Sequence, residues 1–145
     1  SFHAGRTTLS SRILEGKFPD FVGILPKKSA VVTAIAATAF ARSLKLASLF
    51  SRDSAYSTKI SLEGTKLIIE ATSVQLGENR NEVTLEKAVD QPVSVSANAQ
   101  YLIEALGHIN GTASFELTDN KSPIVLRPTS GDAEVLYLVM PLRSE

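Results

Sequence analysis

Residues 29–50 carry apolar side chains at every third or fourth position and are rich in alanine. Two adjacent stripes result: Val31, Ile35 and Ala39, and beside them Val32, Ala36, Phe40, Leu44 and Ala47. This spacing predicts a helix over 29–50, with Ser29 as its N-cap, whose wide apolar face packs against a sheet.

A second, shorter helical pattern covers residues 97–109. Its stripe consists of Tyr101, Leu102, Ala105, Leu106 and Ile109. Asn98 is well suited to cap its start, and Asn110-Gly111 to end it.

The remaining segments alternate as strands or break at glycine and proline. Strands are predicted over 7–14, 58–62, 66–71, 80–86, 92–96, 113–118, 124–127 and 135–140. A turn at Glu63-Gly64 is expected to join the second and third of these, and 119–123 forms another turn. Residues 15–26 contain two glycines and two prolines, which predicts an irregular, extended stretch.

The order of elements is helix, several strands, helix, several strands. It predicts an α+β fold made of a duplicated unit, with both helices packed on antiparallel sheets. A doubly wound parallel sheet is disfavoured because helices do not alternate with single strands.

Composition favours one globular domain. The chain has 145 residues, of which 43% are hydrophobic, and no cysteine, which excludes disulfides and thiolate metal sites. No apolar run approaches the roughly 20 residues of a membrane span, and no signal-peptide pattern is present, so a cytoplasmic protein is expected. Because the chain starts at Ser1 without methionine, we expect it to be a piece of a longer protein.

Charge is unevenly distributed along the chain. Residues 1–66 carry ten basic and four acidic side chains, a net charge of +6, so the remainder carries −6. This asymmetry is compatible either with a surface that faces a polyanion or with charges scattered over a solvated surface.

The sequence contains few of the residues and motifs that enzymes use for catalysis. There are two histidines, His3 and His108, and no nucleophile elbow, phosphate loop or dinucleotide fingerprint. Accordingly no catalytic residue, metal or cofactor is predicted. An enzyme would have to use Asp119 or Asp132 with His108, and no motif supports this.

Two apolar segments suggest a binding surface instead. Residues 18–25 hold many large apolar groups for a loop, and 135–143 end in Met140-Pro141-Leu142-Arg143. Methionine is common in adaptable peptide grooves. A packed loop and a core strand explain these segments equally well on composition alone.

Five segments, in order, carry a resemblance to a known family. They are EGKFPDF at 15–21, AFAR at 39–42, SANAQYL at 96–102, LTD at 117–119 and YLVMPLR at 137–143. Together they resemble the bacterial sliding clamp, the beta subunit of DNA polymerase III, over roughly residues 7–143.

The resemblance implies the third of three clamp domains, with the DNA-clamp fold. Residues 1–15 would hold the start of the chain and the last strand of the preceding domain, 16–28 the interdomain linker and 29–145 the C-terminal domain. In the family two chains close into a ring around double-stranded DNA, which is bound without sequence specificity. Alone, this chain is expected to be monomeric, with 7–14 disordered or paired with another copy.

Residue roles follow from the same resemblance. Arg42 and Lys45 would face duplex DNA or lie near the ring interface. Leu46, Glu78, Arg80 and Glu82 would lie at the ring interface. The partner-peptide pocket would consist of Pro19, Ile24, Asn98, Tyr101, Pro123, Leu138, Met140, Pro141, Leu142 and Arg143.

In this pocket Leu138, Met140, Pro141 and Leu142 would supply an apolar floor, Tyr101 a wall, and Asn98 a group that orients the peptide. Implied partners are the DNA polymerase III alpha subunit, the clamp loader, and other polymerases or repair proteins with linear motifs. Gly23, Lys121 and Pro123 depart from the family pattern, so peptide preference is expected to differ. The alternative is a stand-alone α+β domain that binds peptides or ligands and has no DNA role.

Overall fold

The computed structural model describes residues 1–18, 20–26, 28–131 and 135–142. The elements follow in the order β1 (Phe2–Ala4), β2 (Thr7–Leu9), α1 (Phe21–Ile24), β3 (Val31–Ala36), α2 (Ala37–Phe50), a 3-10 turn (Arg52–Ser54), β4 (Ser57–Ser73), β5 (Gly77–Asn98), α3 (Ala99–Gly107), β6 (Thr112–Leu117), β7 (Ile124–Pro128) and β8 (Tyr137–Val139).

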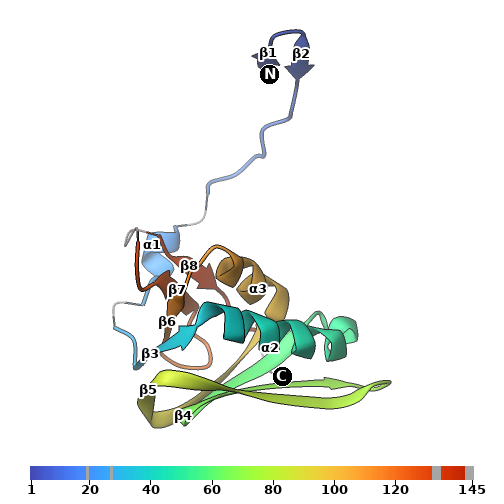
Figure 1. Cartoon of the computed structure of the whole chain (residues 1–145). Coiled ribbons are helices and arrows are strands. Elements are labelled where there is room, and N and C mark those ends of the chain that lie inside the picture. Colours follow the sequence, from blue (N-terminus) through green and yellow to red (C-terminus); the bar gives the residue numbers. More distant parts are fainter. Residues whose placement is uncertain (19, 27, 132–134, 143–145) are drawn as a thin grey trace.

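The body of the molecule consists of two helices on antiparallel sheets, as predicted (Figure 1). One sheet has the order β3-β6-β7-β8, and β4 and β5 pair as a long ribbon. The core between helices and sheets includes Phe40, Leu44, Leu102, Phe115 and Leu126. Among the described residues, no helix is both long enough and apolar enough to cross a membrane.

Each of the two long helices has a hydrogen-bond acceptor for an N–H group in its first turn. The N–H of Ala37 donates to the Gly111 carbonyl at 2.9 Å, which takes the place of a side-chain cap on α2. The Asn98 side chain accepts from the N–H of Gln100 at 2.8 Å, so the predicted cap of α3 is confirmed.

The prediction of one helix over 29–50 is wrong in its first part, where residues 31–36 form strand β3. Val31, Thr33 and Ile35 are buried and Val32 is exposed, a period of two that suits β-branched residues. β6 supplies the hydrogen-bonding partner, from Val31 opposite Leu117 to Ala36 opposite Thr112. Ser29 therefore caps no helix, and its hydroxyl donates to Glu116 instead.

The predicted turn at Glu63-Gly64 is also wrong, because β4 runs through it. Gly64 has φ +55°, and the pairing with β5 shifts register on both sides of it. A glycine in this conformation accommodates a β-bulge as readily as a turn. The strands predicted over 80–86 and 92–96 accordingly form parts of the single strand β5.

The N-terminal segment stands away from the body (Figure 1). Thr7–Leu9 pairs with Phe2–Ala4 of the same chain, which corrects the expectation that this segment is disordered or paired with another copy. The strand predicted over 7–14 ends at Leu9. Within the irregular stretch 15–26, Asp20 caps the single turn α1 by accepting from the N–H of Gly23 at 3.2 Å.

Candidate functional site

A hollow of about 320 Å³ lies between α3 and β8. The lining residues come from one face of the helix and from the whole strand: Tyr101, Glu104, Ala105, His108, Tyr137, Leu138 and Val139. β8 is an edge strand of its sheet, so α3 closes only one side of the hollow and the other side is open.

Aromatic rings form the walls of this α3–β8 hollow. Tyr101 is 61% exposed although it belongs to an apolar stripe. The His108 and Tyr137 rings are stacked, with centroids 6.2 Å apart and planes 11° from parallel. The stack joins the end of α3 to the start of β8, and it holds Tyr137 at the edge of the hollow.

The chain that follows β8 extends this surface. Met140 is 55% exposed, and Pro141 and Leu142 are half-buried. The Leu142 N–H donates to the Ser96 carbonyl on β5 at 2.7 Å, which fixes the segment against the ribbon. Of the predicted floor, Leu138 lines the hollow, and Met140, Pro141 and Leu142 continue directly from it.

The Asn98 side chain is engaged within the chain. Its carbonyl oxygen caps α3, and its amide nitrogen donates to the Ala55 carbonyl at 3.0 Å. These two bonds fix the first turn of α3, and therefore the position of Tyr101. The structure thus assigns Asn98 a positioning role, in addition to any contact it makes with a peptide.

Two other predicted pocket residues that the structure describes, Ile24 and Pro123, do not line the hollow. Ile24 is exposed on α1, and Pro123 is buried immediately before β7. Pro19 and Arg143 lie outside the described residues.

Five lining residues escaped the sequence-based prediction of the pocket: Glu104, Ala105, His108, Tyr137 and Val139. A signal for three of them was present, since Glu104, Ala105 and His108 follow Tyr101 at helical spacing and share its face. Tyr137 belongs to the segment at 137–143 that resembles the sliding clamp. Its position beside α3 follows from the fold and could not be predicted from that segment.

Asp119, one of the two acids of the enzyme alternative, is bound by backbone N–H groups of its own turn. Asp119 accepts from the backbone N–H groups of Lys121 and Ser122 at 2.8 and 2.7 Å, and these bonds lower the pKa of its carboxyl. Asp119 is therefore an ionised anchor of the predicted turn over 119–123, whereas a general acid needs a raised pKa. Asp132 lies outside the described residues, among which no three potential metal ligands come together.

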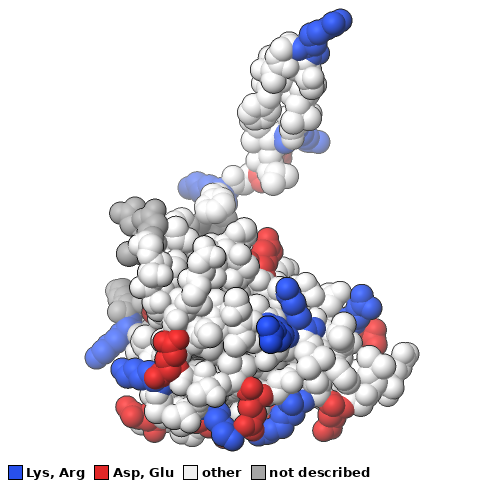
Figure 2. All heavy atoms as spheres, in the orientation of Figure 1, with Lys and Arg blue, Asp and Glu red and all other residues white. Residues whose placement is uncertain are grey.

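The surface of α2 carries the two residues predicted to face DNA. Arg42 and Lys45 are exposed one turn apart, and neither takes part in an ion pair between described residues. In Figure 2, basic atoms gather over α2. Leu46, also on α2, is exposed.

The predicted ring-interface residues on β5 belong to a network of charges shared with β4. Arg80 contacts Glu70 at 2.9 Å and Glu82 at 3.7 Å, and Lys59 contacts Glu70 at 3.5 Å. Lys66 donates to Glu82 at 2.7 Å and lowers its pKa, while Glu78 is exposed near the end of the ribbon. Basic residues of the first half thus neutralise acids of the second, and both signs alternate along the ribbon in Figure 2.

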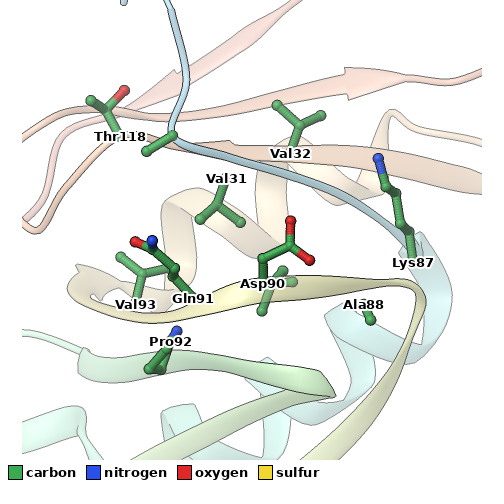
Figure 3. Close-up of a pocket in the computed structure, with 11 residues that line it drawn as sticks. Val31, Val32, Lys87, Ala88, Asp90, Gln91, Pro92, Val93 and Thr118 are labelled. Carbon is green, nitrogen blue, oxygen red and sulfur yellow. The ribbon is translucent and has the colours of Figure 1, made fainter.

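A second hollow, of about 480 Å³, lies between β3 and the bulged part of β5 (Figure 3). In Figure 3, Val31 points from β3 toward Asp90 on β5, whereas Val32, which also lines the hollow, points from the opposite side of β3. The Thr33 hydroxyl donates to the Lys87 carbonyl at 2.6 Å and ties the bulge to β3. This hollow contains none of the predicted site residues.

Comparison with known proteins points to one family. The family described as "DNA polymerase III beta subunit, C-terminal domain" matches residues 23–143. The beta sliding clamp of Caulobacter vibrioides is 28% identical over 144 residues, and that of Staphylococcus aureus 28% over 145. These alignments cover 98% and 99% of this chain but 38% of each relative, so the chain spans about two fifths of their length.

Solved structures agree with these sequence matches. A sliding clamp from Pseudomonas aeruginosa, crystallised with a ligand, has a TM-score of 0.83 at 24% identity. The C. crescentus clamp with bound polyethylene glycol has a TM-score of 0.81 at 26% identity. Each match covers 92% of this chain and 36% of the other.

Proposed function

Because the chain belongs to the family formed by the C-terminal domains of the DNA polymerase III beta subunit, we propose that it is the third domain of a sliding clamp that docks linear peptides of replication proteins. The family is that of a non-catalytic processivity factor, which agrees with the prediction that the chain is not an enzyme. On this proposal, residues 1–15 complete the preceding domain and 16–28 form the linker.

The observation that carries the proposal is the α3–β8 hollow together with the exposed or half-buried apolar segment Met140–Pro141–Leu142 that follows β8 in the chain. An exposed tyrosine, an open strand edge and adaptable apolar groups are the features of a peptide groove. The C. crescentus clamp structure is described as having polyethylene glycol bound to a region proposed to tether beta motifs. The partners proposed are the polymerase III alpha subunit, the clamp loader, and other polymerases or repair proteins.

A fluorescent peptide of the Gln-x-x-Leu-Phe type tests this function directly. We expect binding with a Kd in the micromolar range, about −8 kcal/mol. Tyr101→Ala is expected to weaken it about five- to tenfold, because the exposed ring supplies one wall of the groove. Anisotropy titration measures both affinities.

Leu49→Ala is the matched control, since it removes an exposed apolar group from α2. Equal losses from both variants would assign the Tyr101 effect to general destabilisation. Absence of peptide binding, both by this chain and by a full-length clamp that carries it, would refute the docking function.

For the DNA role, we propose that Arg42 and Lys45 contact duplex phosphates from the helix layer. Such contacts carry no sequence information, which suits a ring that slides. In a full-length clamp that carries this domain, R42A/K45A is expected to lower DNA affinity and reduce the slope of log K against log salt by about 0.9 per lost phosphate contact.

DNA binding measured between about 50 and 200 mM salt checks this result. K59A, at an exposed lysine that already pairs with Glu70, is the control and should leave the slope unchanged. An unchanged slope in R42A/K45A would favour the alternative, a peptide-binding domain without a DNA role.

Ring closure is proposed to use Leu46 together with Glu78, Arg80 and Glu82 on β5. β5 pairs with β4 on one side, so its other edge is available for strand addition. Because the partner edge is expected to lie in a domain outside this sequence, we propose that the chain alone is monomeric and that full-length chains form the homodimeric ring.

A further inference from the structure

We propose that the α3–β8 hollow is a subsite for a basic side chain of the docked peptide, with Glu104 as the anionic residue that selects it. The inference rests on the proposed peptide-docking function, and it adds the class of side chain that this part of the groove prefers.

Glu104 occupies the middle of the hollow's helical wall. It is exposed, and it lies one turn after Tyr101 and one turn before His108, both of which line the same hollow. Successive turns of α3 therefore present an aromatic ring, a carboxylate and an imidazole toward one ligand position.

The carboxylate of Glu104 is not neutralised within the part of the chain that the structure describes. The ion pairs there use Glu15, Glu70, Glu82 and Glu116, and Glu104 is absent from them. Among the described residues that line the hollow it is also the only acidic one. Its favourable partner is therefore a cation that the ligand supplies.

The surroundings of Glu104 suit the rest of a lysine or arginine side chain. Leu138 is half-buried and offers apolar surface along which a methylene stem can lie, and the buried Ala105 and Val139 complete the apolar lining. Tyr101 stands at the side of the hollow, and the Tyr137 ring is held there by its stack on His108. Aromatic faces attract a cationic head group, whereas an acidic head group would be repelled by Glu104.

The segment proposed to hold the peptide's apolar anchors follows, in the chain, the strand that lines the hollow. Leu138 lines the hollow, and Met140 follows Leu138 by two residues. A peptide anchored on Met140–Leu142 can therefore place a residue that flanks its motif beside Glu104.

Two sets of fluorescent peptides test the subsite with the whole chain. Each set keeps one Gln-x-x-Leu-Phe core and varies a single flanking residue, before the core in one set and after it in the other, as lysine, norleucine or glutamate. In the set whose flanking residue reaches Glu104, the lysine peptide is expected to bind about two- to fivefold more tightly than the norleucine peptide, which is the range of an exposed ion pair. The glutamate peptide of that set is expected to bind more weakly than the norleucine peptide.

Glu104→Gln is expected to remove the preference for lysine, so that the lysine and norleucine peptides bind this variant with equal affinity. Glu63→Gln, at an exposed carboxylate on β4, is the matched control and should keep the preference. The preference is also expected to shrink between about 0.05 and 0.5 M salt, because exposed charges are screened.

Equal binding of lysine and norleucine peptides in both sets, or a preference that persists in Glu104→Gln, would overturn the subsite while leaving peptide docking intact. Failure of every peptide to bind both this chain and a full-length clamp that carries it would overturn peptide docking, and the subsite with it.

Discussion

Phe40→Ala is expected to lower the free energy of unfolding by about 3–5 kcal/mol, the range for truncating a large aromatic residue in a core. Phe40 is 0% exposed and lies on α2. Its ring meets that of Phe115 on β6 edge to face, with centroids 5.9 Å apart and planes at 64°. The substitution therefore leaves a cavity where the helix contacts the sheet, and it also removes an aromatic pair.

Urea unfolding followed by circular dichroism measures this loss. Domains of ordinary size have total stabilities of about 5–15 kcal/mol, so the variant is expected to unfold at a much lower urea concentration. Leu49→Ala, on the same helix but 51% exposed, should change stability by about 0.5 kcal/mol or less. A loss under about 1 kcal/mol in Phe40→Ala would contradict the packing of α2 on β6.

Leu142→Asp is expected to weaken peptide binding at least roughly thirtyfold, since desolvating an unpaired charge beneath a bound apolar group costs about 2 kcal/mol or more. Leu142 is half-buried, it follows Leu138 of the α3–β8 hollow by four residues, and its backbone N–H bonds to the Ser96 carbonyl. That backbone bond does not depend on the side chain, so the segment is expected to stay in place.

Anisotropy titration gives the affinity, and a thermal melt shows whether the fold persists. Leu49→Asp makes the same chemical change at an exposed leucine on α2 and should bind peptide normally. Normal binding by Leu142→Asp would place the peptide's apolar anchor elsewhere and remove Leu142 from the groove.

Some features of the fold depend only on local spacing, and these were predictable. Phe40, Leu44 and Ala47 recur at the helical period and are buried in α2, and Asn98 caps α3 because its side chain reaches a nearby N–H. The segments at 96–102 and 137–143 pointed to the family, to which the chain belongs.

Other features depended on partners distant in sequence. Val31 and Ile35 fit a helical stripe as well as a strand, and the pairing of β3 with β6 decides between the two. Likewise, Gly64 has a conformation that serves a turn or a bulge, and the long pairing of β4 with β5 selects the bulge.

The same distinction applies to the site. The sequence by itself determined that Tyr101, Glu104 and His108 share one helical face, because about 3.6 residues make a turn. Only the tertiary structure brought β8 beside that face, stacked Tyr137 on His108 and left Glu104 at an open hollow. Contacts between segments so far apart in the sequence arise from the packing of helix and sheet around one core, and no local pattern encodes that packing.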